Sequence, residues 1–87
     1  MNTQQFITAT RPHFMGGEQI VYQFPNGYGA SVIPMADYHT GTFDPDAVEV
    51  AVLGPDGEIN YDTPITDDVV RISRATLPAL LESIAGL

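Results

Sequence analysis

The stretch that decides the fold reads Gln19-Ile-Val-Tyr-Gln-Phe24, then Pro25-Asn26-Gly27, then Tyr28-Gly-Ala-Ser-Val-Ile33. Two runs rich in β-branched and aromatic residues flank Asn-Gly, whose residues both tolerate positive φ, so the stretch predicts a hairpin. With Asn26-Gly27 as a two-residue loop, Phe24 lies opposite Gly29. Strand alternation then places the bulkier side chains on one face, which we assign to the core: Ile20, Tyr22, Phe24 and Ile33.

A second hairpin is predicted from Val48–Leu53, the turn Gly54-Pro-Asp-Gly57 and a strand over 58–61. Pro55-Asp56 suits the centre of a type I turn, with Gly57 in the left-handed position of a bulge. Both faces of this hairpin carry apolar side chains. A single helix would leave one face uncovered, that of Val48, Val50 and Val52, and this favours a homodimer.

The chain ends in an amphipathic helix, because apolar residues recur at three and four positions: Leu77, Leu80, Leu81, Ile84 and Leu87. Thr76 is its expected cap, with Pro78 in the first turn. Upstream, Thr66 is expected to cap a short helix over 67–70. The segment Met35–Ala47, rich in Asp and interrupted by Pro45, is read as a long loop.

Together these elements predict an α+β fold: a four-stranded antiparallel sheet of two hairpins, with the C-terminal amphipathic helix on one face. We expect residues 1–17 to form a flexible N-terminal arm, with a short strand near Phe6–Thr10, and residues 18–87 to form a single domain. The predicted core joins sheet and helix: Ile20, Tyr22, Phe24, Ile33, Leu77, Leu80, Leu81 and Ile84.

Charge is the most unusual feature of the composition. The 87 residues hold eleven carboxylates against three arginines and no lysine, a formal net charge of −8. Such a chain repels nucleic acid phosphates and anionic lipid, so direct nucleic acid or membrane binding is not expected. A protein with a basic surface is the natural partner, and the alternative is that the acids only maintain solubility. Because the sequence has no long apolar run and no signal-peptide pattern, we expect the protein in the cytoplasm.

Two sets of residues are candidates for partner binding. Seven acids on the loop and the second hairpin could form an acidic face: Asp37, Asp44, Asp46, Glu49, Asp56, Glu58 and Asp62. Three aromatic residues near loops and acids could contribute apolar contacts: Tyr28, Tyr38 and Phe43.

Catalytic and metal-binding patterns are weak. His13 and His39 fall in predicted loops without a partner at ligand spacing. The acids around Asp44 lack the order of a calcium loop, and Ser31 lies mid-strand rather than at a nucleophile elbow. With no cysteine, no thiolate site exists. We therefore assign no catalytic, cofactor-binding or metal residues and predict that the protein is not an enzyme.

Two stretches are distinctive as text: Phe24-Pro-Asn-Gly-Tyr-Gly-Ala-Ser-Val32 and Tyr61-Asp-Thr-Pro-Ile-Thr-Asp-Asp-Val69. With the strand between them and the Leu-Leu-Glu-Ser-Ile helix, the chain resembles a family of small uncharacterised bacteriophage and prophage proteins over roughly residues 22–84. It departs from that pattern in its longer N-terminal arm and in the segment Met35–Ala47.

The resemblance implies a phage accessory protein that acts in the host cell. Small acidic phage proteins often resemble anti-CRISPR and anti-restriction inhibitors, some of which mimic DNA. The leading hypothesis is therefore an anti-defence inhibitor that binds the basic surface of a host nucleic-acid-binding complex. The first alternative is a structural or self-associating phage protein, and the second is a metal-binding enzyme.

Overall fold

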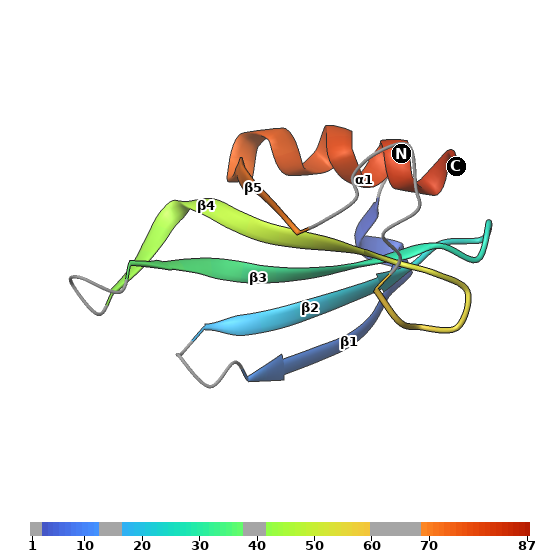
Figure 1. Ribbon diagram of the computed structural model, residues 1–87, viewed down its shortest axis with the longest axis horizontal. Helices are drawn as coiled ribbons and strands as arrows, with labels where there is room; N and C mark the ends of the chain where they lie inside the picture. The colour runs from blue at the N-terminus through green and yellow to red at the C-terminus, as the bar shows by residue number, and fades with distance from the viewer. Residues whose placement is uncertain (1–2, 13–16, 38–41, 60–68) are drawn as a thin grey trace.

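The protein is described by a computed structural model over residues 3–12, 17–37, 42–59 and 69–87, with the backbone alone for 35–37 and 42–45. A 3₁₀ turn, η1 (Thr3–Phe6), leads into five strands, a second 3₁₀ turn, η2 (Arg74–Thr76), and one helix (Figure 1). The strands are β1 (Ile7–Pro12), β2 (Glu18–Gln23), β3 (Gly29–Asp37), β4 (Thr42–Leu53) and β5 (Val70–Ser73), and the helix is α1 (Leu77–Ala85).

The five strands form one antiparallel sheet in the order β1-β2-β3-β4-β5, so each strand pairs with its neighbour in the chain. The predicted α+β class, the antiparallel sheet and the C-terminal helix are confirmed. The predicted number of four strands is wrong, because the sheet has five. β1 and β5 are additional to the two predicted hairpins, and β1 (Ile7–Pro12) overlaps the short strand expected near Phe6–Thr10. The described part of the predicted strand over 58–61 forms only an isolated bridge.

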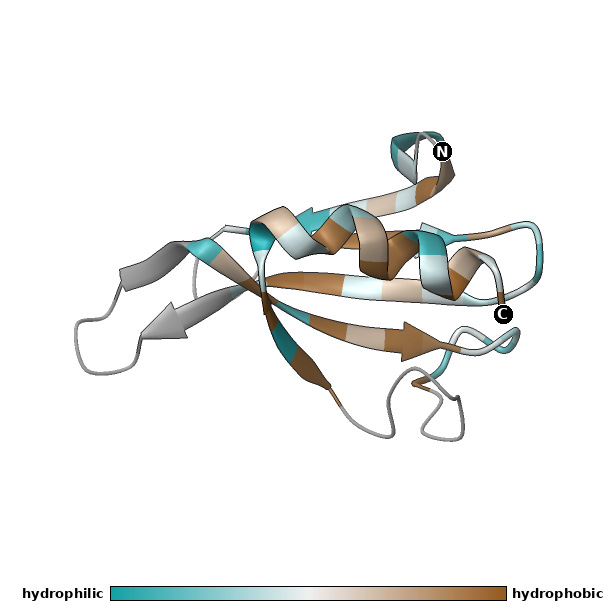
Figure 2. Ribbon diagram, turned by 90° about the horizontal axis from the view of Figure 1, so that it is seen from above, coloured by the Kyte–Doolittle hydropathy of each residue, from teal (hydrophilic) through white to brown (hydrophobic). Residues whose placement is uncertain are grey.

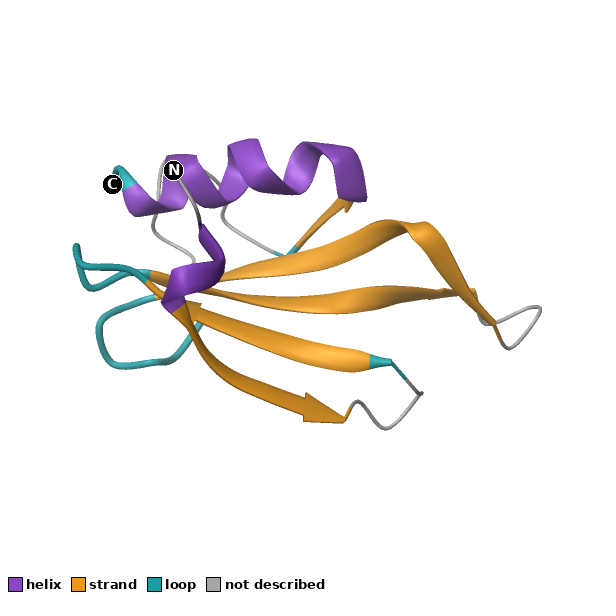
Figure 3. Cartoon of the chain, turned by 180° about the vertical axis from the view of Figure 1, so that it is seen from behind, coloured by secondary structure: helices purple, strands orange, loops and turns teal. Residues whose placement is uncertain are grey.

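The helix packs along one face of the sheet, and the opposite face is not in contact with it (Figures 1 and 3). Leu81 and Ile84 of α1 are buried against side chains of the three central strands. Seen from the helix side, α1 lies above apolar stretches of the strands (Figure 2). The buried cluster consists of Tyr22, Phe24, Ala30, Val32, Val48, Val50, Val52, Leu81 and Ile84.

The first hairpin forms, but its register differs from the prediction by one residue. Tyr22 lies opposite Ala30 and Gln23 opposite Gly29, so Val32 joins the core and Ile33 points to the other face. The cause is Pro25, which has no N–H and so could not form the closing pair of a two-residue loop. Instead the Phe24 N–H donates to the Tyr28 carbonyl at 2.8 Å, and the loop is longer.

Pro25-Asn26 forms the centre of a type I turn, closed by the Gly27 N–H donating to the Phe24 carbonyl at 3.0 Å. Gly27 has φ +92°, but no non-glycine residue of the described chain has positive φ, so the prediction for Asn26 is wrong. The turn at Pro55-Asp56 has the same pattern, with Gly57 at φ +80°, as predicted. Beyond it, Ile59 forms only an isolated bridge with Leu53, and residues 60–61 lie outside the described part.

Two further predictions of local structure are corrected. Much of the predicted loop Met35–Ala47 belongs to β3 and β4, which pair as far as Asp37 and Thr42 with a register shift after Pro34. A shift of this kind accommodates a proline in a strand, because a ladder hydrogen bond is already interrupted there. Val70, predicted to end a short helix, begins β5, while residues 66–68 lie outside the described part.

Val48, Val50 and Val52 were expected on an uncovered face, but each is at most 1% exposed. The three valines pack beneath α1, because side chains alternate along β4. The alternation directs them towards the helix and directs Glu49, Ala51 and Leu53 to the opposite face. The three valines therefore provide no surface for a homodimer.

Candidate functional site: two acidic ends and an uncovered sheet face

The predicted acids separate into two groups at opposite ends of β4. Asp37, Asp44 and Asp46 lie on the far part of the β3–β4 hairpin, where Asp44 pairs with Met35. Asp56 and Glu58 lie in the turn that follows Leu53. Asp44 pairs with Met35 and Leu53 with Gly29, so six steps of β3 separate the two ends, about 20 Å at roughly 3.3 Å per residue. Asp62 lies outside the described part of the chain.

The seventh candidate, Glu49, lies between the two groups and is engaged within the sheet. Arg71, its cross-strand partner on β5, donates from Nε to Glu49 Oε1 at 3.1 Å. The Arg71 side chain is 65% exposed, so this ion pair contributes little to stability. It does reduce the negative charge in the middle of β4. The described part of the chain therefore carries its predicted acidic residues as two ends rather than as one continuous row.

The acidic turn can be compared with its uncharged counterpart in the same chain. Asp56 Oδ1 accepts from the Glu58 N–H at 3.1 Å, and Asn26 Oδ1 accepts from the Tyr28 N–H at 3.0 Å. The two turns therefore require a side-chain oxygen at this position but not a negative charge. The exposed charges of Asp56 and Glu58 have no structural role in this turn that an amide could not fill.

Asn26 has a second contact that Asp56 lacks among the hydrogen bonds described. Its Nδ2 donates to the Ile84 carbonyl at 2.9 Å, which ties the first turn to the last turn of α1. The carbonyls at a helix C-terminus lack partners within the helix, so this bond satisfies one of them. The sequence around Asn26 predicts only its role in the turn, and nothing local in it indicates this contact across the fold.

The three candidate aromatic residues do not gather. Tyr28 directly precedes β3 and is half-buried against the core. Phe43 lies opposite Ala36 at the other end of the same strand pair, and Tyr38 is outside the described part. Their predicted role in partner binding stays a prediction.

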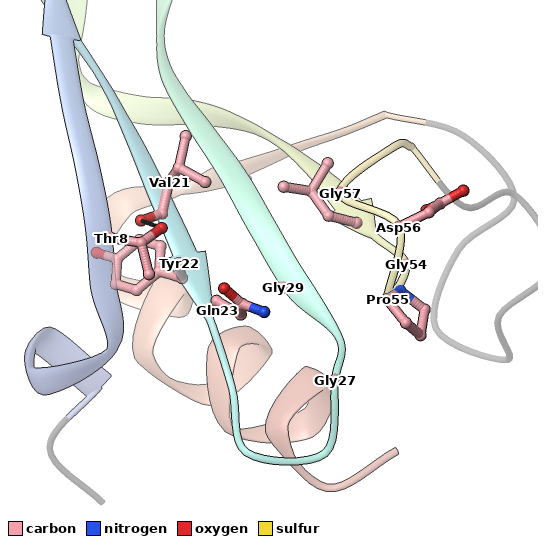
Figure 4. Close-up of a pocket in the computed structure, with 11 residues that line it drawn as sticks. Thr8, Val21, Tyr22, Gln23, Gly27, Gly29, Gly54, Pro55, Asp56 and Gly57 are labelled. Carbon is pink, nitrogen blue, oxygen red and sulfur yellow. Dashed lines mark hydrogen bonds between the residues drawn. The ribbon is translucent and has the colours of Figure 1, made fainter.

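A hollow of about 340 Å³ lies between the two turns. Thr8, Val21 and Gln23 line it from β1 and β2, and Pro55, Asp56 and Gly57 line it from the second turn (Figure 4). Backbone forms much of the remaining wall, through Gly27, Gly29 and Gly54. Gly29 is required here because a Cβ at this position would collide with the Tyr22 carbonyl oxygen.

The sheet face opposite the helix holds a second hollow of about 350 Å³. Ile33, Ala51, Ile59 and Val69 form its apolar lining, and the remaining lining residues are Gln19, Ser31 and Glu49. Gln19 Nε2 donates to Ser31 Oγ at 2.9 Å, so these two polar groups satisfy each other. The sequence did signal an uncovered apolar face on the second hairpin, but the wrong set of alternating residues was assigned to it.

One perturbed ionisation is found at Tyr22, which belongs to the core and to the lining of the first hollow. Desolvation by burial raises the pKa of Tyr22 above its ordinary value of 10.0. Among the described residues, no group of three or more His, Cys, Asp or Glu side chains is placed to hold a metal ion, and His13 and His39 lie outside that part. No helix in the described ranges is long and apolar enough to cross a membrane.

Comparison with known proteins yields no relative: no family model, no curated protein and no solved structure matches the chain.

Proposed function

We propose that this chain is a small acidic phage accessory protein that binds a host protein with a basic surface through the carboxylates at the two ends of β4. The observation that carries this proposal is the arrangement of charge. The formal net charge is −8, yet the middle of β4 is neutralised by the Glu49–Arg71 pair. Negative charge is thereby directed to the ends of a molecule 38 Å long.

Two separated acidic ends favour docking on separate basic patches. A duplex carries one charge per roughly 1.7 Å of its axis, and the described residues offer no such continuous series of carboxylates. We therefore propose electrostatic docking rather than mimicry of a duplex. The proposed partner is a host nucleic-acid-handling complex in the cytoplasm, such as a restriction or CRISPR effector. Exposed charge of this kind accelerates association and selects basic surfaces.

The turn end is the better place to test the proposal, because its charges can be removed without loss of the turn. The double variant Asp56→Asn, Glu58→Gln keeps the Oδ1 acceptor, as Asn26 shows. A matched control, Glu18→Gln with Glu82→Gln, removes the same charge from exposed positions on β2 and α1.

The assay is DNA cleavage by purified restriction and CRISPR effector nucleases, with increasing amounts of the protein at low and at physiological salt. Wild type should inhibit at least one nuclease, and inhibition should weaken as salt rises. The turn variant should inhibit less than wild type, and the control should inhibit like wild type. Absence of inhibition across the panel, or equal loss in the turn variant and the control, would contradict the proposal.

A further inference from the structure

The hollow between the two turns differs from the apolar hollow near the middle of the sheet face, because backbone and polar side chains form much of its wall (Figure 4). Its volume of about 340 Å³ lies at the lower end of the range for ligand pockets, roughly 300–1,000 Å³. A space of this size admits one side chain or one small molecule rather than a large cofactor. The chemistry of the lining therefore decides which group it can take.

The backbone N–H groups of the two turns are already used. The Gly27 N–H donates to the Phe24 carbonyl at 3.0 Å. The N–H groups of Gly54 and Gly57 donate to the carbonyls of Glu58 and Gly54, at 2.8 and 2.9 Å. In the described part of the lining there is no arginine, and the sequence has no lysine. An anion such as phosphate requires free N–H groups or cations around it, so an anion is disfavoured here.

The polar side chains of the lining offer acceptor atoms instead. Asp56 contributes a carboxylate, which has about four acceptor positions and uses one of them on the Glu58 N–H. Thr8 Oγ1 donates its hydrogen to the Val21 carbonyl at 3.4 Å, so the hydroxyl oxygen can still accept. Gln23 is exposed and adds an amide oxygen. A hollow with several acceptors and a negative charge suits a cation that donates several hydrogen bonds.

Apolar side chains complete the wall and select among cations. Val21 and Leu53 contribute from β2 and β4, and Pro55 contributes from the second turn. A guanidinium fits a mixed wall of this kind, because it is planar, presents five donors and is more weakly hydrated than an ammonium. The lysine ammonium is a compact, strongly hydrated charge and gains less from apolar neighbours. The net charge of −8 attracts both cations, whereas the shape and lining of the hollow favour arginine.

We infer that this hollow receives an arginine side chain of the basic partner, with Asp56 as its counter-ion and Thr8 and Gln23 as further acceptors. The inference rests on the proposed function, because it names the residue type by which the partner contacts the turn end of β4. It assigns different roles to the two matching turns. Asn26 holds α1 through the Ile84 carbonyl, and Asp56 binds the partner.

The test is a titration of the isotope-labelled full chain with a blocked glycine–arginine–glycine peptide, followed by amide NMR spectra at physiological salt. Two matched peptides replace the arginine. Citrulline keeps its shape and loses the charge, and lysine keeps the charge and loses the planar group. The arginine peptide should cause saturable shifts around Gln23, Gly29 and Gly54. Its dissociation constant should be lower than that of the lysine peptide by at least roughly threefold, and lower than that of the citrulline peptide by at least roughly tenfold.

Two variants of the lining should each raise the dissociation constant of the arginine peptide by at least roughly fivefold. Asp56→Asn removes the charge and keeps the turn acceptor, and Val21→Phe fills the hollow without changing the charge. Glu18→Gln, at an exposed acid outside the lining, and Ile33→Phe, in the apolar hollow, are the matched controls and should bind like wild type. Equal affinity for the arginine and citrulline peptides, or unchanged affinity in both lining variants, would overturn the inference.

The two proposals fail separately. Nuclease inhibition that depends on the turn charges, without saturable binding of the arginine peptide, would overturn the arginine site and leave the proposed function in place. Saturable binding that is lost in both lining variants, without inhibition of any nuclease, would support the arginine site and contradict the proposed function.

Discussion

Two neighbouring residues, Val32 and Ile33, report the register of the first hairpin. In the structure Val32 is 4% exposed in the core, while Ile33 faces the opposite side and is half-buried. In a register shifted by one residue their positions would exchange, because the side-chain period of a strand is two. Replacing each by alanine therefore tests the register directly.

The expected costs follow from burial. Val32→Ala removes two buried carbons, about 1.6 kcal/mol of transfer free energy at about 0.8 kcal/mol each. The cavity left beneath α1 raises the loss in unfolding free energy to about 2–3 kcal/mol. Ile33→Ala removes three carbons, but from a half-buried site, so its cost is about 1 kcal/mol. The variant that loses fewer atoms should thus lose more stability.

Urea denaturation followed by circular dichroism provides the measurement. Val32→Thr and Ile33→Thr form a second pair that keeps β-branching, and a buried hydroxyl at position 32 should again be the costlier change. A larger loss at Ile33 than at Val32 in both pairs would refute the register.

Three further predictions concern the turn, the buried tyrosine and the helix. Asn26→Asp should lower the unfolding free energy by about 1–2 kcal/mol, because it loses the donor to the Ile84 carbonyl and places negative charge at the C-terminus of α1. Asp56→Asn, at the matching position of the other turn, should stay within about 0.5 kcal/mol of wild type by the same urea titration. Because burial raises the Tyr22 pKa, the folded state retains a proton that the unfolded state releases above pH 10.0. Stability is thus constant with respect to this group below pH 10.0 and falls above it, and Tyr22→Phe should reduce that fall in denaturation midpoints. Leu81→Ala should cost about 2–5 kcal/mol, since Leu81 is 2% exposed, and an unchanged midpoint would remove α1 from the core.

Local signals allowed several elements to be predicted from the sequence. The leucine spacing of residues 77–87 indicated α1, and the Pro-Asp-Gly pattern indicated the turn at Pro55-Asp56 with Gly57 at positive φ. Both depend on interactions within a few residues, which the local sequence contains. Pro25 is a local signal of the same kind: it lacks an N–H and therefore excludes a two-residue loop at Asn26-Gly27.

Other elements depend on pairing between distant residues. The run Val70–Ser73 follows Thr66-Asp-Asp, a typical helix start, but it pairs with β4 as an edge strand of the described sheet. Likewise the aspartates and Pro45 of Met35–Ala47 favoured a loop, while pairing with β4 extends β3 to Asp37 across a register shift at Pro34. Propensity is a weak guide in such segments, because cross-strand contacts contribute more than local preference.

For the candidate surfaces, the sequence by itself determined the amount of charge and the residue types, eleven carboxylates against three arginines. Only the tertiary structure decided their distribution. The length of β4 separates Asp44 and Asp46 from Asp56 and Glu58, and pairing with β5 brings Arg71 to Glu49. The tertiary structure also decided which side chains face α1 and which lie on the opposite face of the sheet. The register of the first hairpin determines this for β3, because a shift of one residue exchanges the two faces of a strand.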